Sequence, residues 1–382
     1  MDNTILHMDL DTFFVSCERL IDSSLIGRPI LVGGTGNRGV VSAASYEARK
    51  YGANSGMSMK LARMRCPEAT IIRGNSSTYT KYSKMVTEIL QENVPVLEKS
   101  SIDEFYADLS GMDRFYGSYK FASELRTSII KETGLPISFG LSINKTVSKV
   151  ATNEAKPNNQ LKIDSGFEKQ FLAPLSVRKI PMVGEKTYYR LRNLGIKKVE
   201  TLQNMPLQAI EQIFGKNGKV MWKRANGIDK SPIVEYHERK SISSERTFEK
   251  DTIDLNKLKS LLIGMSEQLA FQLRNEEKIC SVVTIKIRYS DFNTYTKQIK
   301  IPYTAADHVI IPIVLELFKK LHSKRLLIRL IGVRLGGLTG GNLQISLFDD
   351  VHKTIGLYHA MDDIRKRFGK TSILRASTLY ND

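Results

Sequence analysis

The order of strand-like and helix-like segments over residues 4–165 constrains the fold more than any other feature of this sequence. The apolar stretch TILHMDLD reads as a strand that reaches Asp9. Residues 76–93 then carry apolar side chains at helical spacing behind a serine N-cap. The stretch PVLEKSSIDEFYADLS indicates two further strands. The acidic pair Asp103 and Glu104 is therefore expected near the point where these two strands are joined.

A second helix and a further strand complete this pattern. The helix covers about residues 119–133 and is closed by Gly134, a residue type that tolerates the left-handed backbone after a helix. LPISFGLSI is a strand, and the helix after it begins at Asn144 and ends before Pro157. Strand, helix, strand, strand, helix, strand is a split βαβ order that resembles the ferredoxin-like layout, with residues 13–75 as an insertion after the first strand.

The rest of the chain predicts further parts. After residue 165 the pattern is helical, and the polar stretch SPIVEYHERKSI reads as a linker. Beyond it, SVVTIKIRYSDF, TYTKQIKIPY and RLIGVRLGGL alternate like strands around helices at 254–275 and 306–322. We therefore expect an α+β multidomain protein. Its expected parts are residues 1–12 with 76–165, the insertion 13–75, the helical part 166–231, the linker 232–242, the α/β part 243–341 and the tail 342–382.

Positive charge is concentrated in the second half of the chain. The net charge is +17, of which residues 1–165 contribute +2, residues 166–240 contribute +8 and residues 241–382 contribute +7. A basic second half attached to a nearly neutral first half indicates that the second half provides a surface that binds a polyanion, while the first half has a different function. Charge that serves solubility alone is the alternative.

Several classes of protein are disfavoured. No stretch approaches the roughly eighteen uninterrupted apolar residues of a membrane span. The N-terminus lacks the basic start and the long apolar core of a signal peptide. Cys17, Cys66 and Cys280 lie far apart, with no paired spacing and no neighbouring histidines, which argues against a disulfide framework and against a zinc site. We expect a protein of the reducing cytoplasm, with no membrane partner.

Three carboxylates are expected to converge at one end of the main sheet. Asp9 ends the first strand, and the split βαβ layout places Asp103 and Glu104 beside it. Such a cluster is costly unless cations neutralise it, and Mg²⁺ or Mn²⁺ suits an all-oxygen site. Two ions about 4 Å apart can activate an attacking oxygen and stabilise a leaving one in phosphoryl transfer. For the adjacent pair in isolation, an ordinary solvated turn is the alternative.

Hydrogen-bond donors suited to phosphate occur in two other segments. SYEARKYG supplies Tyr46, Arg49 and Lys50 close to a glycine-rich turn, and AKPN supplies Lys156 at a helix end. Together these groups could meet a polyphosphate. An arginine or a lysine on a helix is otherwise most often part of a solvated face.

Six ordered motifs carry a resemblance to a known family. They are MDLDTFF, SYEARKYG, SSIDEFYADLSG, AKPN, IPMVG with LGI, and RKSISSERTF. Their order and spacing resemble those of the Y-family translesion DNA polymerases, most closely the bacterial DNA polymerase IV group, over essentially the whole chain. The resemblance implies a ferredoxin-like palm at 1–12 and 76–165, fingers at 13–75, a thumb with a helix-hairpin-helix at 166–231, and a little finger domain at 243–341.

The resemblance also implies roles for single residues. Asp9, Asp103 and Glu104 would bind two Mg²⁺ ions, with Mn²⁺ as the alternative, and the backbone carbonyl of Leu10 would be a further ligand. Phe14 occupies the position of the family's steric gate, an aromatic ring that leaves a ribonucleotide's 2′-hydroxyl no room and no partner. The groups implied to hold the triphosphate of the incoming dNTP are the side chains of Tyr46, Arg49 and Lys156 and the backbone amides of Phe13 and Phe14.

The sequence departs from the family pattern at two positions. Ala43 stands where relatives commonly have a hydroxyl residue near the phosphates, which leaves Ser42 or water to compensate. Met182 stands in IPMVG where the first glycine of the hairpin is usual.

Two basic regions are expected to bind DNA. IPMVGEKTYYRLRNLGI looks like a helix-hairpin-helix, with turns at Gly184 and Gly195 and with backbone N–H groups that meet a phosphate at the start of the helix that carries Lys186. A simple αα-hairpin is the alternative. In the little finger, TIKIRYS and TKQIKIP are expected to place basic side chains on one face of the sheet. These side chains are Lys286, Arg288, Lys297 and Lys300.

QISLF, at residues 344–348, resembles the peptide by which bacterial polymerases dock on the sliding clamp. Gln344 would be the polar anchor, and Leu347 and Phe348 would fill an apolar pocket. A leucine–phenylalanine pair in an ordinary core is the alternative.

The sequence therefore predicts a monomeric, DNA-templated DNA polymerase of the translesion type, which joins a dNTP to the 3′-hydroxyl of a primer. The resemblance further implies low fidelity and no proofreading domain. Two alternatives stay open. A nucleotide cyclase on a similar palm would need the acids but not the basic second half of the chain. A catalytically silent DNA-binding scaffold would not need the acids.

Overall fold

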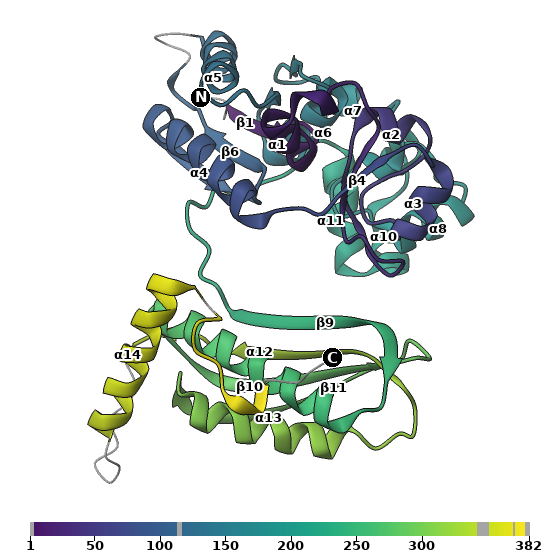
Figure 1. Cartoon of the computed structure of the whole chain (residues 1–382). Coiled ribbons are helices and arrows are strands. Elements are labelled where there is room, and N and C mark those ends of the chain that lie inside the picture. The colour runs from purple at the N-terminus through teal and green to yellow at the C-terminus, as the bar shows by residue number, and fades with distance from the viewer. Residues whose placement is uncertain (1–3, 113–116, 342–350, 370, 379–382) are drawn as a thin grey trace. The chain divides into compact units, whose positions relative to one another are not determined.

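The structure is a computed structural model that describes residues 4–112, 117–341, 351–369 and 371–378 (Figure 1). The chain divides into two compact units, Met1–His237 and Glu238–Asp382. Their boundary falls inside the stretch that was expected as a linker. Part of that stretch belongs to the first unit, because the backbone N–H of Val234 donates to Glu98 at 2.7 Å. Within the described ranges, no helix combines the length and apolarity that crossing a membrane requires.

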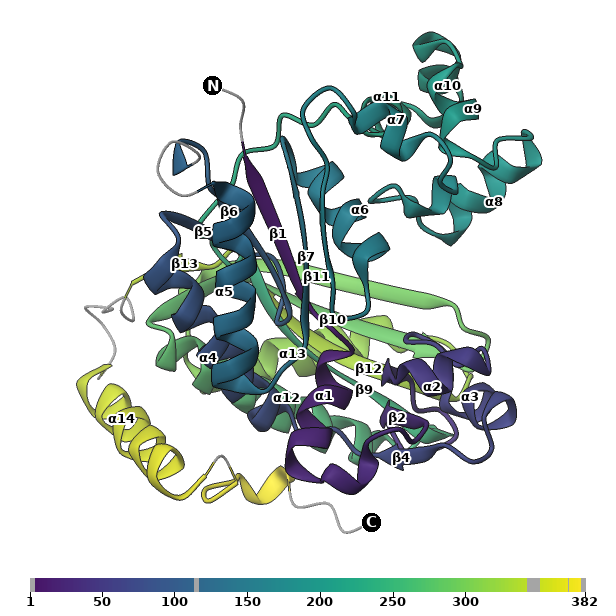
Figure 2. The ribbon, with the colours of Figure 1, turned by 90° about the horizontal axis from the view of Figure 1, so that it is seen from above.

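A five-stranded sheet with the order β5-β6-β1-β7-β8 forms the centre of the first unit. β1 lies between β6 and β7 and is antiparallel to both (Figure 2). With the helices α4 and α5, the strands β1, β5, β6 and β7 form the split βαβ layout expected from the sequence. The elements are β1 (Ile5–Leu10), α4 (Ser76–Asn93), β5 (Val96–Lys99), β6 (Glu104–Asp108), α5 (Ser118–Thr133), β7 (Ile137–Ser142), α6 (Lys145–Ala155) and β8 (Gln160–Lys162).

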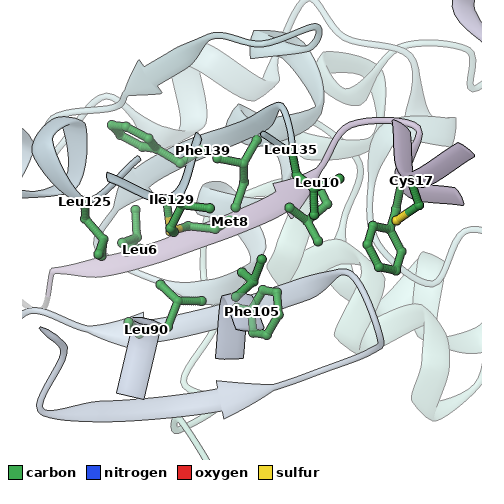
Figure 3. Packing of buried hydrophobic residues seen from close by; sticks show 14 of the residues in the cluster. Leu6, Met8, Leu10, Cys17, Leu90, Phe105, Leu125, Ile129, Leu135 and Phe139 are labelled. Atoms are coloured by element: carbon green, nitrogen blue, oxygen red, sulfur yellow. The ribbon is translucent and has the colours of Figure 1, made fainter. Parts of the chain in front are cut away.

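Helices cover both faces of this sheet, and the alternation of side chains along β1 decides which residue meets which helix. Leu6, Met8 and Leu10 pack into a core shared with α4 and α5 (Figure 3). The residues between them point to the opposite face, which α6 covers. There the Nδ1 atom of His7 lies 2.8 Å from the hydroxyl of Thr152 on α6. Asp9 is therefore also turned towards the side of α6.

The ends of these helices follow from local capping, with one correction. Asn75, and not a serine, caps α4, because its side chain accepts a hydrogen bond from the backbone N–H of Ser77 at 3.1 Å. α5 ends at Gly134, whose left-handed φ of 71° agrees with the expected role of this glycine. Asn144 caps α6 by accepting from the backbone N–H of Val147 at 3.0 Å.

The insertion after β1 contains a second sheet, in the order β3-β2-β4. Phe13, Val15 and Cys17 on α1 belong to the core of the main sheet, which ties the insertion to it. A separate apolar cluster around Met59 lies within the insertion itself. The elements are α1 (Phe13–Ile21), the 3₁₀ turn η1 (Ser23–Leu25), β2 (Ile30–Gly33), β3 (Val41–Ala44), α2 (Tyr46–Lys50), α3 (Met59–Arg65) and β4 (Thr70–Ile72).

Short helices follow β8, as the sequence predicts. Their core includes Val147, Val150 and Ala151 on α6, so the helical part packs against the helix that covers one face of the main sheet. The elements are α7 (Glu168–Leu172), the 3₁₀ turn η3 (Val177–Lys179), α8 (Glu185–Asn193), α9 (Val199–Gln203), α10 (Leu207–Phe214) and α11 (Lys216–Ala225).

The second unit is a sheet with the order β11-β10-β12-β9, packed on two long helices. β9 was not predicted as a strand, and it begins inside the expected linker. Its sequence, SISSERTFEKDT, exposes charged residues at successive positions, which hides the alternation. The elements are β9 (Ser241–Thr252), α12 (Leu255–Asn275), β10 (Lys278–Tyr289), β11 (Thr294–Thr304), α13 (Asp307–Leu321), β12 (Ile328–Gly336), β13 (Thr339–Gly340), α14 (Val351–Phe368) and the 3₁₀ turn η4 (Ala376–Thr378).

The expectation that four basic side chains share one face of this sheet is wrong for Lys297. Lys297 lies opposite Ile285, which is buried, whereas Lys300 lies opposite Val282 on the other face. Residues 297 and 300 are an odd number of positions apart, so a regular strand turns them to opposite faces. Lys286 and Arg288 share the face of Lys300.

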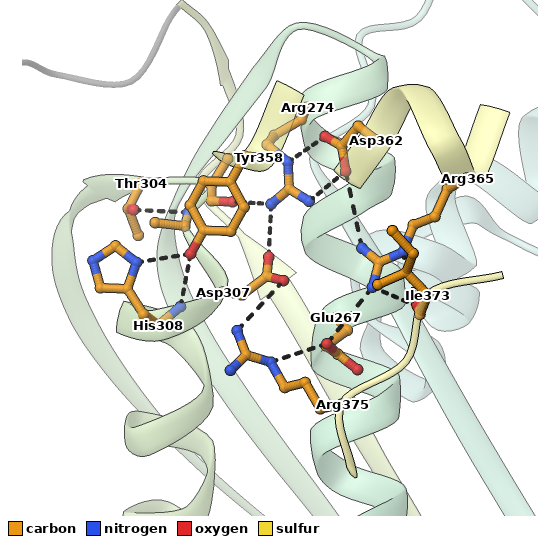
Figure 4. Close-up of polar contacts among 12 residues, drawn as sticks. Glu267, Arg274, Thr304, Asp307, His308, Tyr358, Asp362, Arg365, Ile373 and Arg375 are labelled. Atoms are coloured by element: carbon orange, nitrogen blue, oxygen red, sulfur yellow. Dashed lines mark hydrogen bonds and ion pairs between the residues drawn. The ribbon is translucent and has the colours of Figure 1, made fainter. Parts of the chain in front are cut away.

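α14 packs on the second unit through buried charged groups (Figure 4). The guanidinium of Arg274 on α12 makes two hydrogen bonds to Asp362, at 2.6 and 2.9 Å, and one to Asp307 at 2.6 Å. After the helix, Arg375 reaches Glu267 at 3.0 Å. Over residues 356–368, charge pairing together with the buried ring of Tyr358 thus attaches this helix. Gln344, Leu347 and Phe348 lie outside the described residues.

Candidate active site

Strand pairing brings the three predicted acids to one end of the main sheet. Asp9 on β1 lies directly opposite Glu104, the first residue of β6. The backbone N–H of Leu10 donates to the carbonyl of Asp103 at 3.0 Å. The turn before β6 is held by Ser101, whose hydroxyl donates to the Asp103 carboxylate at 2.6 Å and accepts from the backbone N–H of Glu104 at 3.0 Å. The acids thus come from a strand end and from the turn beside it.

A cavity of about 140 Å³ opens beside these acids. It brings together most of the residues that the sequence assigned to metal and nucleotide. Tyr46 and Glu104 do not line it, and Thr12 and Ser55 were not foreseen there. The lining residues are Asp9, Leu10, Thr12, Phe13, Phe14, Ser42, Ala43, Arg49, Ser55, Asp103 and Lys156.

Two lysines pair with the acids. The ammonium group of Lys156, the residue after α6, forms an ion pair with Asp9. Lys149 on α6 forms another with Glu104 at 2.6 Å, which accounts for the direction of the Glu104 carboxylate. These pairs follow from the alternation along β1, because Asp9 faces the side that α6 covers.

Burial perturbs the acid on β1. Desolvation raises the pKa of Asp9 from its ordinary 3.8 to about 7, although the charge of Lys156 lowers it, and the neighbouring Glu104 and Asp103 raise it further. The ion pair with Lys156 therefore offsets only part of the cost of burying the Asp9 carboxylate.

The donor chemistry fits a hard divalent cation. Across the described residues, no group of three or more histidine, cysteine, aspartate or glutamate side chains is arranged to hold a metal ion. Asp9, Leu10 and Asp103 nevertheless line one cavity, and Glu104 is adjacent to Asp9 through the strand register. Carboxylate and carbonyl oxygens are the ligands that Mg²⁺ and Mn²⁺ prefer. The charge of a divalent ion would also stabilise the ionised Asp9 carboxylate and so oppose the desolvation that raises its pKa.

Phe14, at the first turn of α1, is held by a second aromatic ring. Its ring stacks on that of Tyr79 from α4, with the centroids 4.3 Å apart and the planes 14° from parallel. The Tyr79 hydroxyl in turn donates to Glu18 at 2.5 Å. Stacking on Tyr79, which is itself held by Glu18, therefore stabilises the position of the Phe14 ring at the cavity.

Arg49 and Tyr46 come from the short helix α2. The Nε atom of Arg49 donates to the carbonyl of Ala44 at 3.0 Å, and its guanidinium lies over the Tyr46 ring at 5.1 Å from the centroid. The other four N–H groups of the guanidinium take no part in this backbone contact, and Arg49 lines the cavity.

Comparison with known proteins identifies the family. Family models match the impB/mucB/samB family over residues 8–153, the C-terminal domain of that family over 239–347, and the DNA polymerase-iota thumb domain over 178–229. A DNA polymerase IV of Dehalococcoides mccartyi (strain CBDB1) is 37% identical and covers 98% of this chain and 97% of its own length. The DNA polymerase IV of Halorhodospira halophila is 35% identical over 90% of this chain and 98% of its own.

A solved Y-family DNA polymerase chimera of Dbh and Dpo4 has a TM-score of 0.76 to this structure at 25% identity, and covers 88% of this chain and 100% of the chimera. The chain belongs to the Y-family of DNA polymerases. It is a DNA-directed DNA polymerase of the translesion type, with a ferredoxin-like palm, an inserted fingers part, a helical thumb and an α/β little finger, as the sequence predicted.

The backbone at Met182, in the thumb of this Y-family polymerase, shows why a glycine is usual at this position. Met182, at the position where a hairpin glycine is usual, has a φ of 74°. This left-handed conformation costs a side-chain-bearing residue about 1–2 kcal/mol, and glycine avoids that cost. Gly184 directly precedes α8, and Gly195 after α8 has a φ of 80°. Lys186 in the first turn of α8 is exposed.

Sequence reasoning missed two residues of this polymerase's site. Lys149 was read only as part of a helix, yet it lies four residues after Lys145 and seven before Lys156, a spacing that places the three lysines near one side of α6. Tyr79 lies within the helix predicted for residues 76–93, and its stacking on Phe14 depends on the tertiary structure.

Proposed function

We propose that this Y-family polymerase binds two Mg²⁺ ions, with Mn²⁺ as the alternative, through Asp9, Asp103, Glu104 and the backbone carbonyl of Leu10. The observation that carries this proposal is the register that sets Asp9 opposite Glu104 at the edge of a cavity lined by Asp103 and Arg49. Bound there, the ions would activate the attacking 3′-hydroxyl of the primer and stabilise the leaving pyrophosphate.

The residues of the chain position the dNTP. Lys156 exchanges its partner Asp9 for a phosphate oxygen when the nucleotide enters, because the flexible lysine stem lets one ammonium group serve either anion. Tyr46 and Arg49 hold further phosphate oxygens, together with the Ser42 hydroxyl. The backbone amides of Phe13 and Phe14 lie in the first turn of α1, where N–H groups have no intrahelical partner.

Phe14 serves as the steric gate. Its ring lines the cavity and stacks on Tyr79, so a 2′-hydroxyl would meet an aromatic ring that the stack stabilises in this position. Phe14→Ala is expected to raise ribonucleotide incorporation in single-nucleotide insertion assays, and unchanged sugar discrimination would remove this role.

The metal site is tested by primer extension and by metal binding. Asp103→Ala combined with Glu104→Ala should abolish templated extension and weaken the binding of Mn²⁺, measured by electron paramagnetic resonance. The matched control is Asp108→Asn, because Asp108 lies at the far end of β6, opposite Ile5. Extension that survives the double change would refute the proposed ligands, whereas loss of extension in the control variant would indicate damage to the sheet.

DNA is held by the thumb and the little finger. The N–H groups at the start of α8, after Gly184, meet a backbone phosphate next to Lys186, and Gly195 closes the turn at the other end of this helix. In the little finger, Lys286, Arg288 and Lys300 share one face, and Lys297 extends from the edge strand β11 on the other. Replacing Lys300 by Ala should reduce the salt dependence of DNA binding by about one phosphate contact.

The segment QISLF docks on the sliding clamp, with Gln344 as the polar anchor and with Leu347 and Phe348 in an apolar pocket. Replacing Leu347 and Phe348 by Ala should abolish clamp-stimulated synthesis and leave basal synthesis unchanged, with Ser346→Ala as the control. An equal loss of both activities would point to a role in folding.

The enzyme acts as a monomer in the cytoplasm, which gel filtration and cell fractionation would test.

A further inference from the structure

Asp11 is a buried carboxylate that the proposed chemistry does not use. It follows β1 and is 1% exposed. Its Oδ2 atom accepts hydrogen bonds from the backbone N–H of Asn158 at 2.5 Å and from the hydroxyl of Ser138 on β7 at 2.8 Å. One oxygen of Asp11 thus ties the turn after Lys156 to the main sheet. Burying a carboxylate is costly, so its charge calls for a partner beyond these neutral donors.

The second oxygen of Asp11 has a cationic neighbour. Oδ1 lies 3.8 Å from the ammonium nitrogen of Lys156, which itself pairs with Asp9. This oxygen is buried and has no hydrogen-bond partner among the residues that the structure describes. An oxygen in this position attracts the ammonium group by charge without fixing it through a hydrogen bond.

We propose that Asp11 is a positioning residue that holds Lys156 in place for the incoming triphosphate, given the nucleotide-binding role proposed for Lys156. Through Oδ2 it fixes the backbone that follows Lys156. Through Oδ1 it keeps the ammonium group beside Asp9 and the cavity, which limits the rotamers of a side chain with four rotatable bonds. Asp11 itself touches neither the nucleotide nor the reacting atoms.

Asp11→Asn tests this role, because it keeps the shape and one acceptor oxygen for Asn158 and Ser138 but removes the charge. We expect the KM for the dNTP to rise about tenfold in primer extension, the size of effect typical of losing one contact to a charged group. The kcat at saturating dNTP should stay within about twofold, and the Kd for primer–template DNA should not change. An equal fall of kcat at an unchanged KM would overturn the proposal.

A double-mutant cycle with Lys156→Ala separates this inference from the function on which it rests. If Asp11 acts through Lys156, adding Asp11→Asn to Lys156→Ala should change the KM by less than about twofold. A further tenfold rise would overturn the positioning role and leave the role of Lys156 intact. A Lys156→Ala variant with the wild-type KM would instead refute triphosphate binding by Lys156, and the positioning role with it.

Ser138→Ala distinguishes the positioning of Lys156 by the charge of Asp11 from a purely structural attachment of Asp11 to β7. It removes one hydrogen bond to the Asp11 carboxylate but leaves its charge, so the KM should stay within about twofold while the midpoint of thermal unfolding falls. A rise in KM as large as that of Asp11→Asn would overturn the proposal, because it would show that holding the two strands together is what matters. If Asp11→Asn does not fold, Asp11→Ser, which can still accept from Asn158, should show the same rise in KM.

Discussion

Tyr79 should set how strictly Phe14 excludes ribonucleotides. The two rings are 4.3 Å apart and nearly parallel, and Glu18 holds the Tyr79 hydroxyl at 2.5 Å. An aromatic pair contributes about 0.5–1.5 kcal/mol beyond the area that it buries. If this energy keeps the Phe14 ring at the cavity, removing the stack should raise the fraction of molecules in which the ring has moved away by about two- to tenfold.

The variant Tyr79→Leu removes this support while keeping an apolar side chain. We expect the ratio of kcat/KM for dCTP to that for CTP, measured in single-nucleotide insertion opposite guanine, to fall about two- to tenfold. Phe14→Ala should lower the ratio further, because it removes the ring itself. Tyr79→Phe is the matched control, since it keeps the stack and loses only the bond to Glu18, and its ratio should change less than about twofold.

Two results would refute this reasoning. A wild-type ratio in Tyr79→Leu, together with a collapsed ratio in Phe14→Ala, would show that the gate needs no support from α4. A fall in Tyr79→Phe as large as in Tyr79→Leu would show that the hydroxyl, rather than the stacked ring, holds the gate.

Other perturbations have definite expected signs. Arg274→Met should destabilise the second unit by about 3–5 kcal/mol in urea unfolding, because it removes the nearest cationic partner of the buried carboxylates of Asp307 and Asp362. Met182→Gly should stabilise the first unit by about 1 kcal/mol in calorimetry, because glycine adopts a φ of 74° without strain. Lys149→Met should lower the Mg²⁺ concentration for half-maximal extension by about threefold, because it removes a cation that competes for Glu104. A change of the opposite sign would contradict each expectation.

The order of elements in the palm could be predicted because its signals are local. Apolar periodicity marks α4 and α5, Asn144 and Gly134 mark helix ends, and the short apolar run before Asp9 marks β1. These signals do not depend on how distant segments pack. β9 was missed because its outward charges break the alternation, and the packing of α14 was missed because charged residues attach it.

The acids of the site could be predicted because strand order alone places Asp9 near Asp103 and Glu104. The face of a single side chain is harder. Lys297 and Lys300 lie three positions apart on one strand, so they could not share a face. Which of the two shares the face of Lys286 follows only from the register between β10 and β11, which a sequence does not display. The roles of Lys149 and Tyr79 depend on contacts between segments far apart in the chain.

The two lysines explain how the chain can fold with three acids at one strand end. Alternation along β1 turns Asp9 towards α6, and the same helix and its end supply Lys149 and Lys156. The ion pair with Lys156 offsets part of the desolvation that raises the pKa of Asp9. In the proposed reaction, Asp9, Asp103 and Glu104 would hold the metal ions, and Lys156 would bind oxygens of the triphosphate. The charges that stabilise the folded site are thus also the charges that bind the nucleotide, so substitutions there should alter stability and activity together.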